Sequence, residues 1–146
     1  MTSGAIGMFE GAVHRFPVRV YFEDTDLSGV VYHANYLRYM ERARSDMLAA
    51  VGVDQRGAHE AGEGVYAVSE PTIRYRAPAR LDDRLTVESR VVRIGAATPT
   101  IQQRVRRGDV TLTEATVTAA FVAPGGRPRR QPAAWVAAFE RVMETG

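Results

Sequence analysis

The stretch YFEDTDLSGVVYHANYLRYMERARSDML, residues 21–48, joins a cluster of carboxylates to a long amphipathic segment. Glu23, Asp24 and Asp26 crowd together ahead of a Ser-Gly turn, and an apolar pair and a Tyr-His follow at once. Like charges this close repel one another, so they must be solvated or paired. The stretch therefore predicts either a simple turn or a built site directly before a helix.

Residues 34–51 carry the apolar period of a helix. Apolar side chains recur at alternating steps of four and three residues: Tyr36, Met40, Ala43, Met47 and Ala50. Charged side chains lie mostly on the opposite face, which predicts an amphipathic helix of about five turns. Gly52 is expected to end this helix. A shorter helical piece is expected over residues 54–61, with Asp54 as its cap.

Segments typical of strands flank this helix. Residues 16–24 alternate apolar and polar side chains, which indicates a half-buried strand. After Gly64, four further segments are rich in Val, Ile, Thr or aromatic residues: 66–77, 84–95, 99–107 and 110–123. Pro71 predicts a bulge or an edge position in the first of these. The apolar face of the last switches near Glu114, which indicates a bulge or a strand buried on both faces.

The order of these elements predicts an α+β fold with the helix packed on one face of an antiparallel sheet. Short connections make neighbouring strands antiparallel, and the wide apolar face of the helix has to lie against the sheet. A short terminal helix is expected over residues 131–144. We expect a flexible leader over residues 1–12 and a single domain over residues 13–146. The uncovered sheet face and edge predict a dimer that continues or covers them.

The composition excludes several classes of function. The 146 residues contain no cysteine, which excludes thiolate nucleophiles and Cys-ligated zinc. No apolar run approaches the roughly 20 residues that span a bilayer, and the N-terminus is not a good signal peptide, so a cytoplasmic location is the default. The net charge of +2 does not demand nucleic acid. The three histidines, His14, His33 and His59, have no paired ligand spacing, so no metal is predicted.

Residues 20–48 resemble the opening motif of the 4-hydroxybenzoyl-CoA thioesterase family of hotdog-fold proteins. APARLDDRLTVE, residues 77–88, is similar to a second signature of the Tol-Pal-associated branch. The similarity covers about residues 14–123. It implies a long central α-helix wrapped by a five- to six-stranded antiparallel sheet, and hydrolysis of acyl-CoA thioesters. Coenzyme A is then part of the substrate, with no separate cofactor.

The same resemblance has implications for partners and location. It implies at least a homodimer and allows a homotetramer. It also allows an association with a Tol-Pal type envelope system, and hence a cytoplasmic protein that lies peripheral to the inner membrane.

The resemblance assigns the catalytic carboxylate to Asp26. Thioester hydrolysis needs a group that attacks the carbonyl carbon or activates water, and donors for the oxygen that gains negative charge. A carboxylate just before a helix start, with free backbone N–H groups a few residues later, supplies both. By resemblance, the His33 amide polarises the carbonyl, with the Tyr32 and Ala34 amides as helpers. The His33 side chain would contact substrate, water or Asp26.

The residues alone leave alternatives open. Asp26 also fits an Asx turn that leads into the Ser-Gly pair, and the sequence does not choose between direct attack by Asp26 and activation of water. A hotdog hydratase or dehydratase would keep the fold, but those enzymes use other arrangements than the spacing from Asp26 to His33. The main alternative is a non-catalytic acyl-CoA-binding or scaffold protein of a cell-envelope complex.

Four further side chains are candidates for substrate binding. Tyr32 and Tyr36 are candidates for an acyl pocket, although aromatic residues at helical spacing are usually core. Arg93 and Thr98 lie in a connection where, by resemblance, related enzymes grip the CoA nucleotide; solvated strand residues are the competing interpretation. Asn35 is interpreted as a structural residue that caps the helix or ties down the loop before it.

Overall fold

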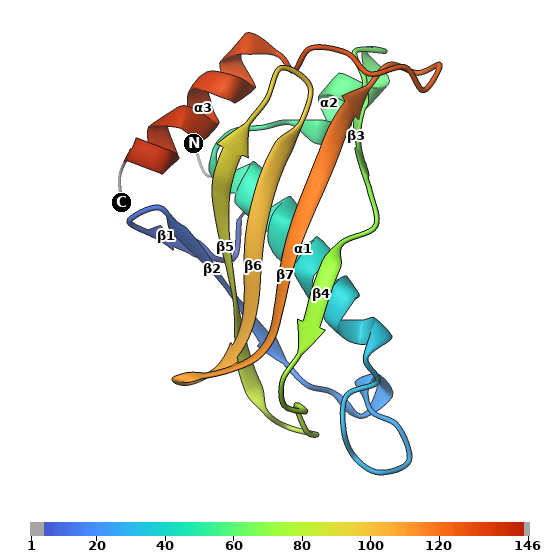
Figure 1. Cartoon of the computed structure of the whole chain (residues 1–146), viewed down its shortest axis with the longest axis vertical. Helices are drawn as coiled ribbons and strands as arrows, with labels where there is room; N and C mark the ends of the chain where they lie inside the picture. The colour runs from blue at the N-terminus through green and yellow to red at the C-terminus, as the bar shows by residue number, and fades with distance from the viewer. Residues whose placement is uncertain (1–4, 145–146) are drawn as a thin grey trace.

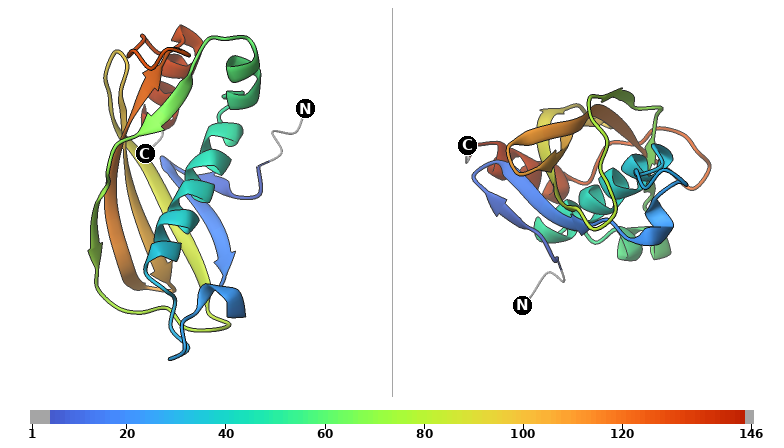
Figure 2. Two further views of the ribbon diagram at one scale, coloured as in Figure 1. Left: turned by 90° about the vertical axis from the view of Figure 1, so that its right-hand side faces the viewer. Right: turned by 90° about the horizontal axis from the view of Figure 1, so that it is seen from below.

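A curved antiparallel sheet wraps one long helix in the computed structural model, which describes residues 5–144 (Figure 1). The elements are, in chain order, β1 (Met8–Glu10), β2 (Val13–Arg19), the 3-10 helix η1 (Phe22–Asp24), α1 (Ala34–Ala50), α2 (Gln55–Glu60), β3 (Val65–Val68), β4 (Thr72–Tyr75), β5 (Arg84–Ile94), β6 (Pro99–Arg107), β7 (Val110–Val122) and α3 (Ala133–Glu144). The sheet order is β1-β2-β5-β6-β7-β3, and β4 also pairs with β7. Figure 2 shows α1 on the inner side of the curved sheet, which confirms the predicted α+β architecture.

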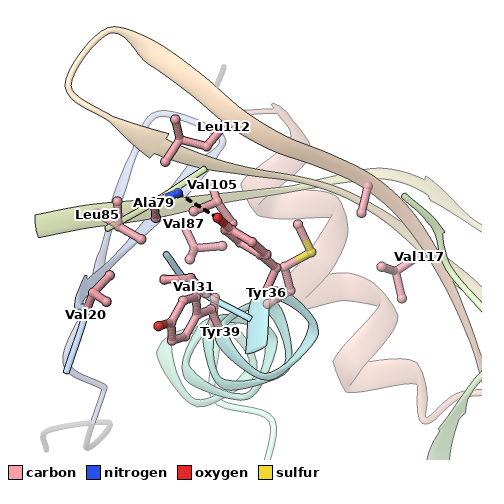
Figure 3. Packing of buried hydrophobic residues seen from close by; sticks show 13 residues of the cluster. Val20, Val31, Tyr36, Tyr39, Ala79, Leu85, Val87, Val105, Leu112 and Val117 are labelled. Atoms are coloured by element: carbon pink, nitrogen blue, oxygen red, sulfur yellow. Dashed lines mark hydrogen bonds between the residues drawn. The ribbon is translucent and has the colours of Figure 1, made fainter. Parts of the chain in front are cut away.

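Helix α1 follows the predicted apolar period almost to the residue. Its inward side chains are buried: Tyr36, Tyr39, Met40, Ala43, Met47 and Leu48. The N-terminal half of this set packs against Val87, Val105 and Leu112 from β5, β6 and β7 in the main core cluster (Figure 3). The helix ends before Gly52, whose positive φ of 85° is a conformation that glycine takes at little cost.

The long strands β5, β6 and β7 also lie where their sequence patterns predict. β7 carries one extra residue, Leu112, opposite the step from Val105 to Arg106 in β6. This register shift confirms a bulge in β7, placed two residues before the switch seen at Glu114. Asp54 caps α2 as predicted, because its Oδ1 accepts a hydrogen bond of 2.9 Å from a first-turn amide.

The strand predicted over residues 16–24 is wrong at its end, because β2 stops at Arg19. Asp24 accounts for the difference. Its Oδ2 accepts a hydrogen bond from the Tyr21 amide at 2.9 Å, and its own amide donates to the Tyr21 carbonyl at 3.0 Å. A side chain that bonds nearby backbone competes with the strand ladder. The acidic cluster therefore lies in a turn beyond the sheet.

The second predicted strand segment is divided into β3 and β4 around Pro71. Val68 pairs with Ala119 and Thr72 pairs with Thr116. The chain therefore advances four residues on this segment while it advances three on β7. The extra residue makes a β-bulge, where proline fits because it has no N–H to donate. Both alternatives predicted for Pro71 are present, since β3 and β4 also form an edge of the sheet.

The N-terminal segment packs against α1, which corrects the flexible leader expected over residues 1–12. The amides of Ile6 and Gly7 donate to the two carboxylate oxygens of Asp46 on α1, at 2.7 and 2.8 Å. His14 is fully buried, with its Nε2 3.0 Å from the same carboxylate. A contact between segments so far apart in the chain leaves no local pattern. The first four residues of the leader lie outside the described residues. Together with the divided edge strand, β1 raises the strand count from the expected five or six to seven.

The C-terminal helix α3 packs over the end of the sheet where β5 turns into β6 (Figure 1). Phe139 is fully buried there, in a second apolar cluster with Leu48 and Ile101. This confirms the terminal helix expected over residues 131–144. In the part of the chain that the structure describes, no helix combines the length and the apolar content needed to cross a bilayer.

Candidate active site

A small hairpin leads from η1 into α1 and carries the acidic motif. Thr25 and Val31 form an antiparallel bridge, and the Asp26 amide donates to the Val30 carbonyl at 2.9 Å. Gly29 closes the turn with a positive φ of 81°, and its amide donates to the Asp26 carbonyl at 3.1 Å. This hairpin, which carries Asp26, lies at the end of the molecule where α1 begins (Figure 1).

The Asp26 carboxylate is exposed and held by Ser28. Its Oδ1 accepts hydrogen bonds from the Ser28 amide at 2.8 Å and from the Ser28 hydroxyl at 2.6 Å. The Asx turn weighed as an alternative is therefore present. These bonds lower the pKa of Asp26 below its ordinary value, so the group is ionised at neutral pH. Among the described residues, no hydrogen bond engages Oδ2, and none joins Asp26 to the His33 side chain.

The start of α1 presents backbone donors beside this hairpin. The Asn35 amide donates to the Tyr32 carbonyl at 2.8 Å, and the Tyr36 amide donates to the His33 carbonyl at 3.3 Å. The amides of His33 and Ala34 have no acceptor within residues 5–144, and both residues are exposed. A helix start combines free N–H groups with the positive end of the helix dipole. Two donors are therefore available for an oxyanion.

Asn35 ties the hairpin to the helix, as its structural interpretation expected. Its Nδ2 donates to the Asp24 carbonyl at 2.9 Å, and that carbonyl also accepts the Tyr32 amide at 3.0 Å. Arg38 donates to the Asn35 Oδ1 at 3.2 Å, so both ends of the buried amide group are used. The distance between the acidic loop and the free amides is thus set by a fixed polar contact.

Aromatic rings surround the His33 imidazole. The Tyr32 ring stacks on it at a centroid distance of 5.2 Å, and Tyr32 is about half exposed. The Tyr75 ring meets it edge-on at 5.6 Å, and the Tyr75 hydroxyl donates to the His33 carbonyl at 3.3 Å. Sequence reasoning missed Tyr75, because nothing local indicates that the end of β4 lies beside the start of α1.

Tyr36 belongs to the core, which corrects its assignment to an acyl pocket. Its hydroxyl accepts a hydrogen bond from the Ala79 amide at 2.8 Å, and its ring lies among the buried residues (Figure 3). Burial raises the pKa of this hydroxyl. The competing interpretation, that aromatic residues at helical spacing are core, is the one that holds for Tyr36.

Arg93 and Thr98 lie at the other end of the molecule from Asp26. Arg93 is exposed near the end of β5, and the Thr98 carbonyl accepts the Gly95 amide at 2.8 Å in the turn into β6. Figures 1 and 2 show this turn beside α3, beyond the C-terminal end of α1. The 17 residues of α1 span about 25 Å. One chain therefore does not bring the two predicted groups of residues into one site.

A groove of about 520 Å³ runs between α1 and β3, and we call it the α1–β3 groove. Its lining includes Leu37, Arg44 and Leu48 of α1, Tyr66 and Val68 of β3, and Phe139 of α3. This volume is within the range of small-molecule sites. No sequence pattern indicated the groove, because its walls come from segments far apart in the chain. Within residues 5–144, no group of three or more His, Asp or Glu side chains is placed to hold a metal ion.

A curved antiparallel sheet wrapped around one long helix is the arrangement of the hotdog fold. The profile of the thioesterase superfamily matches residues 28–114. The chain belongs to the thioesterase superfamily, which confirms the resemblance found in its sequence.

Named relatives agree with this membership. The chain is 44% identical over 107 residues to the acyl-CoA thioesterase YbgC of Haemophilus influenzae, covering 73% of this chain and 79% of that one. It is 40% identical over 129 residues to the acyl-CoA thioester hydrolase YbgC of Escherichia coli, covering 87% and 96%. A probable thioesterase from Bartonella henselae has a similar structure, with a TM-score of 0.78 and 37% identity over 83% of this chain and 100% of that one.

Proposed function

We propose that this chain hydrolyses acyl-CoA thioesters to a free acid and coenzyme A. One observation carries the proposal: an exposed, ionised carboxylate lies on the same hairpin-to-helix segment as two backbone donors that have no acceptor in the described part of the chain, and Asn35 ties the hairpin to the helix. The names of the relatives support the substrate class. Water is the second reactant, so the reaction needs no cofactor beyond the CoA of the substrate.

In the proposed mechanism, the thioester carbonyl oxygen accepts hydrogen bonds from the amides of His33 and Ala34. These donors stabilise the negative charge that the oxygen gains as the carbonyl carbon is attacked. Asp26 supplies the attack in one of two ways. Its carboxylate adds to the carbon and expels the CoA thiolate, and water then cleaves the resulting anhydride; or it takes a proton from a water that attacks the carbon directly.

The His33 ring and its aromatic neighbours complete the proposed site. The ring is held between Tyr32 and Tyr75, so its position beside the helix start is defined. We propose that it contacts the thioester or the attacking water. Tyr32 is exposed and offers an apolar face to the part of the acyl group nearest the carbonyl.

We propose that the active unit contains at least two chains. The edge formed by β3 and β4 exposes apolar side chains, namely Val65, Val68 and Tyr75. Such an edge favours pairing with another strand. A second copy would also bring its own Arg93 and Thr98 near the Asp26 loop of the first, where they could bind the CoA nucleotide. A tetramer, a cytoplasmic location and association with a Tol-Pal type system stay predictions.

The test is release of free thiol from a panel of acyl-CoAs by the wild type and by Asp26→Asn. Asparagine keeps the size of the side chain and removes the nucleophile or base, so hydrolysis should be lost while circular dichroism stays unchanged. Undiminished hydrolysis by the variant would rule out the assigned carboxylate. Binding of acyl-CoA by the wild type without thiol release would favour the non-catalytic binding or scaffold protein.

A further inference from the structure

We infer that α3 sets the length of the acyl chain by closing the far end of the α1–β3 groove, which holds an aliphatic acyl group. The inference rests on the proposed function, because it places the acyl part of the same substrate. It goes beyond that function by naming the class of acyl group and the element that limits it.

The groove begins at Leu37, about one turn of α1 beyond His33. His33 and Leu37 are four residues apart, so they follow one another on the same face of α1. Glu41, Arg44 and Leu48 continue that face at helical spacing, and all three line the groove. A chain attached to a carbonyl at the helix start can therefore run along α1 into the groove without crossing the helix.

The character of the lining changes along the groove. Arg38 and Glu41 near the mouth are exposed and charged, whereas Leu48, Ile101 and Phe139 at the far end are buried and apolar. Between them, Arg44 is turned toward the sheet, where it donates to the Oε1 of the fully buried Gln103 at 2.9 Å. Its aliphatic stem is then free to line the wall. A polar mouth and an apolar end match a thioester with a hydrocarbon tail.

Helix α3 forms the closed end and is anchored there. Gln131, just before the helix, accepts a hydrogen bond from the Tyr66 hydroxyl at 2.6 Å and donates from its Nε2 to the Gly95 carbonyl at 2.8 Å. Its own amide donates to the Ala96 carbonyl at 2.9 Å. With these bonds in place, Phe139 is held in the second core cluster beside Leu48. The end wall is therefore a packed part of the fold.

The length of the groove sets the size of the chain. Leu37 and Leu48 are 11 residues apart, which corresponds to about 16 Å along the helix axis. An extended zigzag chain advances about 1.2 Å per bond. The groove therefore accommodates roughly a dozen carbon atoms. The proposed site places the carbonyl at the His33 amide, four residues or about 6 Å before Leu37, so the acyl chain from the carbonyl to the far wall has roughly 18 carbon atoms, and the wall should reject longer chains.

The first test is kcat/KM for straight-chain acyl-CoAs from butanoyl to docosanoyl. For the wild type we expect a rise of up to about fourfold for each methylene that enters the groove, which is about 0.8 kcal/mol each, up to about octadecanoyl and then a fall. Ser45 of α1 also lines the groove. Ser45→Phe therefore places a ring in the groove and should lower the value for octadecanoyl-CoA by at least about tenfold, while butanoyl-CoA stays within about twofold. Phe139→Leu should raise the value for chains just beyond the wild-type optimum.

Glu140→Ala is the matched control, because Glu140 is exposed and adjoins Phe139 on α3. It should leave the chain-length profile unchanged. A flat wild-type profile, an equal effect of Ser45→Phe on all chains, or a shift with Glu140→Ala as large as with Phe139→Leu would overturn the inference. Each of these results contradicts the role of α3 only. The proposed function still stands if Asp26→Asn loses hydrolysis.

The second test reads binding without catalysis. The single tryptophan, Trp135, packs against Tyr66 at a centroid distance of 5.7 Å, and Tyr66 lines the groove. Dodecanoate should change the Trp135 fluorescence in the wild type and not in Ser45→Phe, whereas butyrate should have little effect. This result supports the groove even if no acyl-CoA is hydrolysed. The inference would be overturned if the wild type does not respond to dodecanoate and Ser45→Phe changes the oligomeric mass measured by light scattering. Those two results together would show that a second copy fills the groove.

Discussion

Proline at position 33 separates the backbone role of the helix start from the role of the imidazole. His33 has φ of −63° and ψ of −22°, so its φ matches the value of about −65° that the proline ring imposes. The amide that proline removes has no acceptor among the described residues, so no internal hydrogen bond is lost. Tyr32, the preceding residue, lies outside the helix. His33→Pro is therefore a substitution that the fold can accept.

The magnitude follows from the proposed oxyanion role. Removing one donor of this kind typically costs about 3–4 kcal/mol of transition-state stabilisation, which is a loss of roughly 100- to 1,000-fold in rate. His33→Ala is the matched control, since it removes the same side chain and keeps the amide. The expected result is that kcat/KM of His33→Pro falls below that of His33→Ala by this factor.

Stability should move the other way. Proline at a compatible φ restricts the unfolded chain, which typically stabilises a protein by about 0.4–1 kcal/mol. Thiol release at several acyl-CoA concentrations and thermal unfolding of both variants provide the two measurements. If the two variants have the same kcat/KM and are both folded, the His33 amide does not bind the oxyanion, and the proposed mechanism loses its main electrostatic component.

Three further predictions follow from polar contacts. Hydrogen bonds from Ser28 lower the pKa of Asp26 below 3.8, so the pH profile of kcat/KM should show no acid limb from Asp26 above about pH 4. Ser28→Ala should move that limb to higher pH. An unmoved limb would mean that Asp26 is not the titrating group. Asn35→Ala leaves the Asp24 carbonyl without its side-chain donor, so urea unfolding should show a loss of about 1–3 kcal/mol, with lower kcat; unchanged values for both would contradict the tether. Burial lowers the pKa of His14 while Asp46 opposes the shift. The unfolded chain therefore binds a proton more readily below pH 6.5, and stability should fall as the pH drops below this value; His14→Gln should flatten that dependence in urea melts at pH 5 and pH 7.

The parts of the fold with a strong local period were predictable. Helix α1 repeats apolar residues over its whole length, and β5 to β7 are long segments rich in Val, Ile and Thr between short connections, so their bounds agree closely with the patterns. The end of β2 was not predictable in this way, because the Asp24 side chain replaces strand bonds with a local turn. The packing of the N-terminal segment depends on Asp46, which belongs to another element.

The candidate site could be predicted only as far as it lies in one segment. Asp26, His33 and the free amides follow one another within a few residues, so the motif indicates them together. Tyr75 arrives from β4, and the position of Arg93 at the opposite end depends on how the strands are arranged around α1. Both facts arise from the topology of the sheet, which no spacing along the sequence encodes.

The Asp46 carboxylate joins the hairpin of β1 and β2, with the residues just before it, to helix α1. It meets two backbone donors and a buried imidazole at once, so these contacts should be lost together when the hairpin opens. Such a unit can detach cooperatively while the rest of the chain stays native. Amide protons of β1 and β2 should then exchange with solvent in a common, sub-global step, and Asp46→Asn should accelerate that step far more than exchange in β6 or β7.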